Sequence, residues 1–320
     1  MNTLLDVKKL SIDFKTSNGI VKAVEDVNFK INEKEIFALV GESGCGKSTI
    51  AFSLMRLLAK NGMIADGNIY FKGKDVLKLT EKEMFSFRGK EIGMIFQNPL
   101  DSLNPVMTVG GQVLESLLLD NITREKAWQK VIEVFEDVRI PDSKERIKSY
   151  PFELSGGMRQ RAMISMMISR KPLLLIADEP TTALDVTIQA QILKVIKRLK
   201  DEFNTSVLLI THDFGVVAET ADRIGVMYAG NLVEMGEVFE VFENPLHPYT
   251  KLLMQALPTI SKKEGRLVTI PGMVPNLINP PDGCRFSNRC PQKKDICTKI
   301  KPDFKEYPQE HYCSCHLEVQ

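Results

Sequence analysis

A glycine-rich loop at residues 41–49 constrains this chain more than any other feature. It reads Gly41-Glu-Ser-Gly-Cys-Gly-Lys-Ser-Thr49 and fits the pattern G-x-x-x-x-G-K-[ST]. Glycines let backbone N–H groups turn towards a phosphate, and a following helix points its positive end at it. Lys47 is expected to reach the β- and γ-phosphates, and the Ser48 hydroxyl to bind Mg²⁺. Strand-like residues 35–40 and helical spacing at 48–58 favour this nucleotide site over a plain turn.

An apolar run ending in two acids supplies a second candidate site. It reads Leu173-Leu-Leu-Ile-Ala-Asp178-Glu179. Asp178 is suited to hold Mg²⁺ through the coordination shell of the ion, and Glu179 is suited to polarise an attacking water. A strand with a polar turn is common in α/β sheets. The glycine-rich loop in the same chain makes the functional interpretation the better one.

Alternating strand and helix signals predict a parallel sheet flanked by helices. Residues 1–95 look strand-rich, and the helical block at about 98–160 is interpreted as an insertion. Further strands are expected at 68–72, 92–96, 173–177, 206–210, 224–228 and 231–235, and helices at 109–119, 124–137, 157–169 and 188–202.

Composition excludes several classes of protein. Apolar residues make up 43% of the 320 residues and charged residues 26%, as in ordinary globular proteins. The net charge of +1 provides no general attraction for nucleic acid. The apolar runs are too short to span a bilayer, and the N-terminus does not resemble a signal peptide. We therefore expect a cytoplasmic chain whose membrane role, if any, runs through a partner.

Several further motifs resemble those of the ABC ATPases. Leu154-Ser-Gly-Gly-Met-Arg-Gln160 is similar to their signature, although Met158 replaces the commoner Gln, and Lys34 stands where a Gly often precedes the strand. The order of the motifs along residues 4–240 matches their order in that family. The resemblance implies a P-loop NTPase cassette, with a RecA-like α/β core, an antiparallel β part and a helical insertion. The other matching elements are Phe14 (the adenine-stacking aromatic), Gln97 (Q-loop), Ala183-Leu184-Asp185 (D-loop) and His212 (switch histidine).

The resemblance implies a role for each motif residue. Glu179, His212 and Gln97 would be catalytic, and Ser48, Gln97 and Asp178 would hold Mg²⁺. The Ser-Gly-Gly nest would serve the nucleotide of an opposite subunit, so that two cassettes complete two sites. Phe14 could equally be a core aromatic, and an isolated histidine is more often structural. The nucleotide-binding set is Phe14, Gly41, Ser43, Gly44, Cys45, Gly46, Lys47, Ser48, Thr49, Ser155, Gly156 and Gly157.

Within that family, the chain is similar to the peptide and nickel importers. The segments Phe96 to Pro105 and Tyr150 to Arg161 carry this likeness, together with His247-Pro-Tyr-Thr250. It implies an ATPase that powers import of dipeptides or oligopeptides, with nickel as the alternative cargo. A soluble ABC ATPase acting on ribosomes or DNA is a weaker alternative, because those usually have paired cassettes or basic extensions.

The same likeness implies the partners and the location. We expect a second, related but different ATPase chain, two transmembrane permease subunits and an external substrate-binding protein, with no nucleic acid. The chain would lie peripherally on the cytoplasmic face of the cell membrane.

The tail after residue 240 is rich in proline and cysteine, which predicts an ATPase domain at 1–240 and an extension at 241–320. Cytosolic cysteine clusters more often bind metal than form disulfides. The resemblance implies a [4Fe-4S] cluster on four thiolates, with Zn²⁺ or unmetallated thiols as alternatives. Cys313 competes for the fourth place, which the resemblance gives to Cys315, and the thiol of Cys45 is interpreted as incidental. The four expected ligands are Cys284, Cys290, Cys297 and Cys315.

Overall fold

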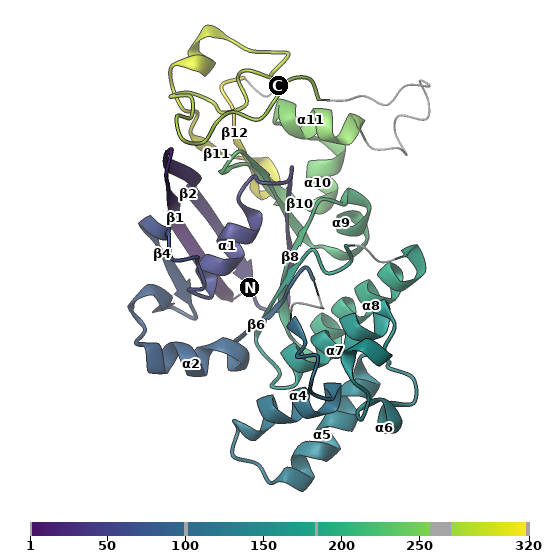
Figure 1. Cartoon of the computed structure of the whole chain (residues 1–320). Helices are drawn as coiled ribbons and strands as arrows, with labels where there is room; N and C mark the ends of the chain where they lie inside the picture. The colour runs from purple at the N-terminus through teal and green to yellow at the C-terminus, as the bar shows by residue number, and fades with distance from the viewer. Residues whose placement is uncertain (1, 99–101, 183–184, 257–269, 318–320) are drawn as a thin grey trace. The chain divides into compact units, whose positions relative to one another are not determined.

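The computed structural model describes residues 2–98, 102–182, 185–256 and 270–317 (Figure 1). The chain divides into two compact units that are each assembled from separate stretches. The first comprises Met1–Asn2, Asn32–Ile36 and Leu79–Ile210, and the second comprises Thr3–Ile31, Phe37–Lys78 and Thr211–Gln320. The domain boundary predicted near residue 240 falls inside the second unit and stays a prediction.

Three parallel strands form the sheet of the first unit. β7 (Leu174–Asp178) pairs with β6 (Ile92–Ile95) on one side and with β8 (Ser206–Thr211) on the other. All three strands are buried along their whole length, which explains their continuous apolar sequences. The predicted parallel sheet is confirmed here.

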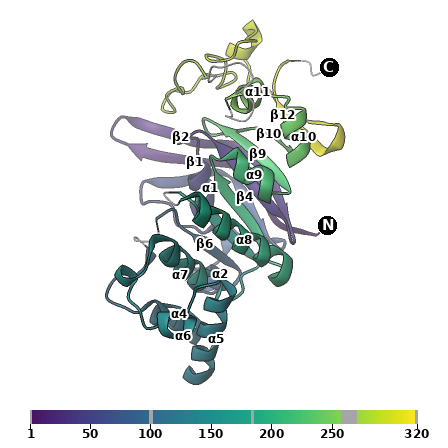
Figure 2. The same cartoon turned by 90° about the vertical axis from the view of Figure 1, so that its right-hand side faces the viewer.

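Helices make up the rest of the first unit, and the predicted helical block is confirmed. α4 (Val109–Leu118) packs on α5 (Arg124–Asp137) and on α7 (Gly156–Ile168), and α5 also contacts α6 (Ser143–Arg146). These helices gather into one group in Figures 1 and 2. The other elements of this unit are α2 (Glu81–Lys90), the 3₁₀ turn η2 (Pro151–Glu153) and α8 (Val186–Phe203).

The strand-rich interpretation of residues 1–95 missed α2. A reciprocal capping box starts this helix: the Thr80 hydroxyl accepts from the Glu83 N–H, while the Glu83 carboxylate accepts from Thr80 N–H at 2.7 Å. That pair satisfies donors which otherwise have no partner in a first turn. The T-x-x-E pattern at 80–83 is the sequence signal that would have predicted the helix.

The second unit contains an antiparallel sheet in the order β2-β1-β4-β5. Its strands are β1 (Thr3–Thr16), β2 (Gly19–Asn32), β4 (Gly62–Phe71) and β5 (Lys74–Asp75), followed by the 3₁₀ turn η1 (Val76–Lys78). β4 runs antiparallel to both β1 and β5. This sheet is the antiparallel part expected of the cassette.

A second sheet segment of the same unit joins the tail to the nucleotide-binding part. β3 (Ile36–Gly41) pairs in parallel with β9 (Arg223–Tyr228), which pairs antiparallel with β10 (Asn231–Glu237). β12 (His311–Ser314) then pairs with β10, and β11 (Phe304–Tyr307) with β12. The two tail strands were not predicted, because each has only four residues and neither is a continuous apolar run.

The helices of the second unit are short. They are α1 (Lys47–Leu54), α9 (Phe214–Thr220), α10 (Val238–Glu243) and α11 (Pro248–Gln255), with 3₁₀ turns η3 (Asp295–Thr298) and η4 (Pro308–Glu310). Throughout the described ranges, every helix falls short of the length and apolar character needed to cross a bilayer.

Aromatic side chains bind the tail into the core of the second unit. Phe286 is 1% exposed and packs against Tyr228 and Tyr249, with ring centroids 5.0 and 5.3 Å away. All three belong to one buried cluster that also contains Val40 of β3. The described part of the tail therefore shares the core that supports the glycine-rich loop.

Candidate nucleotide site

The predicted phosphate loop connects β3 to α1, as its sequence context requires. Gly41 and Gly46 adopt positive φ angles of 151° and 105°. A Cβ at Gly41 would lie 2.2 Å from the Met227 carbonyl oxygen, and one at Gly46 would lie 2.8 Å from that of Ala23. Both positions therefore exclude any side chain. Ser43 and Gly44 are exposed at the tip, and Ser48 and Thr49 begin α1 half-buried.

Lys47 places its charge inside this loop although the residue is only 5% exposed. Its Nζ donates to the carbonyl oxygens of Gly41 at 2.8 Å and Glu42 at 3.1 Å. The Cys45 Sγ lies 3.7 Å from the same Nζ, and burial raises the pKa of this thiol. Cys45 therefore contributes packing and backbone to the loop, and the interpretation of its thiol as incidental stays a prediction.

His212 lies directly after β8 and is exposed. The next residue fixes its backbone, because the Asp213 carboxylate caps α9 by accepting from Gly215 N–H at 2.8 Å and Val216 N–H at 3.2 Å. Asp213 also donates its own N–H to the Thr211 hydroxyl at 3.0 Å. Hydrogen bonds of Asp213 therefore connect the histidine segment to the end of β8 and to the start of α9.

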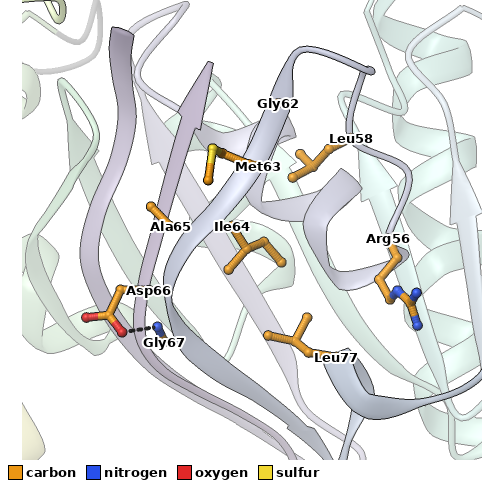
Figure 3. Close-up of a pocket in the computed structure, with 9 residues that line it drawn as sticks. All are labelled: Arg56, Leu58, Gly62, Met63, Ile64, Ala65, Asp66, Gly67 and Leu77. Atoms are coloured by element: carbon orange, nitrogen blue, oxygen red, sulfur yellow. Dashed lines mark hydrogen bonds between the residues drawn. The ribbon is translucent and has the colours of Figure 1, made fainter. Parts of the chain in front are cut away.

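Phe14 lies on β1 opposite Gly62 of β4 and is half-buried. A Cβ on Gly62 would meet the Phe14 ring at 2.7 Å, so the ring lies directly on the glycine. Gly62 also lines an open pocket beside β4, where Leu58, Ile64 and Leu77 supply apolar surface (Figure 3). The one carboxylate of that pocket, Asp66, accepts from Gly67 N–H at 2.8 Å. Arg56 supplies the basic group among the lining residues.

In the first unit, the two acids follow β7 as predicted. Asp178 is buried, and Glu179 has a positive φ of 46°, which is uncommon outside glycine. The Glu179 carboxylate accepts from Gln97 Nε2 at 3.0 Å and from the Thr182 hydroxyl at 2.8 Å. The structure thus brings Gln97 and Glu179 together. Thr182 was missed, although it lies only three residues after the glutamate.

The signature motif begins α7. Ser155 is the N-cap, and its hydroxyl accepts from Met158 N–H at 3.4 Å. Gly157 is buried, since a Cβ there would lie 2.7 Å from Ile188 of α8, whereas one at Gly156 would meet nothing within 4 Å. Gln160 donates to the Pro180 carbonyl oxygen at 2.7 Å, which ties the signature helix to the residue after Glu179.

The D-loop lies partly outside the described residues, which exclude 183–184. Its last member, Asp185, is the N-cap of α8 and accepts from Ile188 N–H at 3.0 Å. Lys34 has a positive φ of 60°, which explains why a glycine suits this position.

The four predicted cysteine ligands line one pocket of the tail. They do so with His247, Pro248, Phe286, Ser287, Gln292, His316 and Leu317, whereas Cys313 is buried on β12 and is not among the lining residues. Burial, with smaller contributions from the neighbouring thiols, raises the pKa of Cys284 to about 11. Among the described residues, no three His, Cys, Asp or Glu side chains are close enough to bind a metal ion. The predicted iron–sulfur or zinc cofactor is therefore not confirmed.

Comparison with known proteins gives two family matches. The ABC transporter family matches residues 24–182, and the oligopeptide/dipeptide transporter C-terminal region matches residues 233–297. The oligopeptide transport ATP-binding protein OppD of Salmonella typhimurium is 47% identical over 94% of this chain and 90% of its own length. The dipeptide transport ATP-binding protein DppD of Bacillus subtilis is 46% identical over 100% of this chain and 96% of its own length.

Solved structures agree with these matches. A dimeric post-hydrolysis state of the ATP-binding cassette MJ0796, bound to ADP and Pi, superposes with a TM-score of 0.66. It is 26% identical and covers 73% of this chain and 98% of its own. CbiO1 from Clostridium perfringens, part of an ABC transporter complex, has the same TM-score at 25% identity, over 76% of this chain and 92% of its own. The chain therefore belongs to the ATPase subunits of ABC transporters, in the group that carries the oligopeptide/dipeptide transporter C-terminal region.

Proposed function

We propose that this chain hydrolyses ATP to power the import of oligopeptides or dipeptides. One observation carries the proposal. Nearly the whole chain, including the tail, aligns with proteins named for peptide transport, at 46–47% identity. No feature of the described residues favours nickel or a role away from membranes. The peptide itself would be selected by other subunits, because this chain supplies the nucleotide chemistry.

Each motif residue has a part in the proposed reaction. Lys47 and the backbone N–H groups of residues 43–49, including those of Ser43, Gly44 and Thr49, bind the phosphates, while Ser48, Asp178 and Gln97 hold Mg²⁺. Phe14 stacks on adenine, and His212 contacts the γ-phosphate. The Ser155-Gly156-Gly157 nest, at the start of a 13-residue helix, serves the nucleotide of a second cassette.

Glu179 is the proposed general base. The hydrogen bonds from Gln97 and Thr182 hold one carboxylate oxygen, Oε2, in a defined position. The carboxylate held in this way is the group that would accept a proton from the attacking water.

The proposed partners are a second, related ATPase chain, two permease subunits and an external binding protein. The chain would lie on the cytoplasmic face of the membrane, bound through the permeases. Exposed apolar side chains of the first unit support such docking: Val106 is 79% exposed and Phe152 is 69% exposed. The Phe152 ring stacks on Tyr150 with centroids 5.6 Å apart, which makes a rigid apolar surface.

We also propose that Cys284, Cys290, Cys297 and Cys315 hold a [4Fe-4S] cluster. A single Zn²⁺ needs four sulfurs at about 2.3 Å from one point, and no such close group is present among the described residues. A cluster is wider and suits four thiols spread around one pocket. The buried Ser287 hydroxyl supports the fit, since it lines the same pocket and has no hydrogen-bond partner among the described residues. When bound, the cluster would staple a tail too small to fold on its own core.

Reconstitution tests the main proposal. The chain should be co-expressed with the permease and ATPase genes of its own operon, and uptake of labelled peptide measured in vesicles. Peptide uptake that depends on ATP and on this chain is the expected result. Uptake of nickel but not peptide, or failure to co-purify with any permease, would overturn it.

Two serine variants test the cluster. Cys315→Ser should lose iron, acid-labile sulfide and absorbance near 400 nm, because it removes a proposed ligand. Cys313→Ser is the matched control: it is two residues away and should retain all three. A protein purified without oxygen that contains zinc or no metal would contradict the assignment.

A further inference from the structure

An arginine of the tail contacts the phosphate loop. Arg289 lies between α11 and η3, one residue before Cys290. Its Nη1 donates to both carboxylate oxygens of Glu42, at 3.1 and 2.9 Å. Glu42 is the second residue of the phosphate loop, 247 positions earlier in the chain.

The guanidinium is held on every side. Its Nε donates to the Pro271 carbonyl oxygen at 2.9 Å and its Nη2 to that of Ile270 at 3.2 Å. It also lies over the Tyr228 ring, 5.7 Å from the centroid. The arginine side chain is 6% exposed and that of Glu42 is 28% exposed, so this pair is partly shielded from water. Its position is therefore fixed before any ligand arrives.

A second tail residue acts on the same loop residue. The hydroxyl of Tyr249 on α11, a fully buried side chain, accepts from the Glu42 N–H at 3.1 Å. The Glu42 carbonyl oxygen accepts from Lys47 Nζ. The N–H, the carbonyl and the carboxylate of Glu42 are thus all bonded, two of them by residues of the tail.

An acidic side chain is unfavourable in a loop that binds a triphosphate. A carboxylate without a partner would repel the phosphates, and its effect is strong where water is partly excluded. Arg289 offsets that charge and holds the carboxylate in place. We propose that Arg289 is a positioning residue for ATP, through which the C-terminal extension sets the nucleotide affinity of the phosphate loop. This inference rests on the proposed binding of ATP by residues 41–49.

A charge-removal cycle tests it. The dissociation constant for MgATP would be measured by calorimetry on the full chain, purified without oxygen. Arg289→Ala should weaken binding roughly tenfold, the order expected for one added like-charge interaction. Glu42→Gln should change it less than about twofold, and the double variant should return close to the Glu42→Gln value. A purely structural role for Arg289 predicts no such rescue, so a double variant as weak as Arg289→Ala would overturn the proposal.

Another arginine of the tail provides the matched control. Arg285 donates to the Glu25 carboxylate at 2.9 Å, but Glu25 lies on β2 and not in the phosphate loop. In the corresponding cycle, Glu25→Gln should not restore any ATP affinity that Arg285→Ala has lost. Lys47→Ala distinguishes a failure of the proposed ATP site from a failure of the proposed role of Arg289. If that variant binds ATP normally, the site assignment fails; if it loses ATP while the Arg289 cycle shows no coupling, only the present inference fails.

Hydrogen exchange of the unmodified chain covers the case in which Arg289→Ala does not fold. Coupling between two sites is reciprocal, so MgATP should slow exchange in tail peptides covering residues 285–290 as well as in the phosphate loop. Slower exchange in the loop alone would overturn the proposal.

Discussion

At the scale of single residues, local geometry distinguishes side chains that look equivalent in the sequence. Asp178 and Glu179 are adjacent acids, yet one is buried at the end of β7 while the other turns out of the strand at a positive φ. Cys313 and Cys315 are two positions apart, yet only the second lines the thiol pocket. The sequence shows which residues are acids or cysteines. The direction in which each side chain points depends on the backbone angles and on the neighbouring residues.

The proposed base predicts a specific defect. Glu179→Gln should bind MgATP normally but lower kcat by about 100-fold or more, since removal of a general base costs on the order of 10²–10⁴ in rate. Steady-state phosphate release together with calorimetry separates the two effects. Thr182→Val is the comparison, because it removes only one of the hydrogen bonds to that carboxylate and should lower kcat less. Equal turnover by wild type and Glu179→Gln would reject the assignment.

Acid should weaken the first unit through Asp120. Hydrogen bonds from Arg170, the shortest at 2.6 Å, outweigh burial and hold the pKa of Asp120 below its usual value of 3.8. Because the folded pKa lies below the unfolded one, this stabilisation is complete at neutral pH and is lost as pH falls from about 4 towards the folded pKa. Asp120→Asn should cost up to about 1 kcal/mol at pH 7, given its partial exposure, and less below pH 4.

Urea titrations between pH 7 and pH 3.5 would measure that difference. Asp201→Asn, at an exposed position of α8, is the control and should change little at any pH. A cost for Asp120→Asn that stays constant with pH would show that the ion pair is not its source.

At the scale of elements, most helices and strands were predicted from the spacing of apolar residues and from the glycines and polar residues that bound each segment. α5 begins and ends where predicted, and β7 and β8 lie within one residue of the predicted bounds. The misses were α2, which needed its capping box to be recognised, the short helices α6, α9, α10 and α11, and the strands β11 and β12. β11 and β12 are short and lack the continuous apolar sequence by which the equally short β6 was predicted, so their pairing depends on the partner strand.

Helix packing predicts different outcomes for two adjacent glycines. Gly157→Ala should destabilise the first unit by about 1–2 kcal/mol, because its Cβ would meet the stiff, β-branched Ile188 of α8. Gly156→Ala is the control, since its Cβ has no neighbour within 4 Å. Urea unfolding of both variants without nucleotide measures the packing effect alone. Equal stabilities would show that α8 moves aside without cost.

At the scale of the whole molecule, the tail is part of the ATPase and not an appendage. Glu234 on β10 is fully buried and accepts from Leu246 N–H at 2.6 Å and His247 N–H at 2.9 Å. Its Oε1 also lies 2.8 Å from His311 Nε2 on β12. One carboxylate therefore connects β10, the segment leading into α11 and the last strand of the chain.

Loss of this contact should loosen the tail. His311→Ala leaves part of a buried carboxylate without its partner, which costs about 2 kcal/mol. His316→Ala removes one hydrogen bond, to the Ile300 carbonyl oxygen, at a partly exposed site and should cost less. Thermal unfolding and hydrogen exchange at residues 311–314 measure both effects. If the two variants are equally stable, the Glu234 network does not hold the tail.

By itself, the sequence determined the phosphate loop at 41–49, the alternation of strands and helices, and the family to which the chain belongs. These depend on short-range rules of spacing, glycine placement and apolar period, all of which are visible along the chain. Only the tertiary structure decided that Arg289 meets Glu42, which of the cysteines share a pocket, and that β12 extends β10. Such contacts join residues far apart in the chain, and no local pattern encodes a pairing that shared burial alone creates.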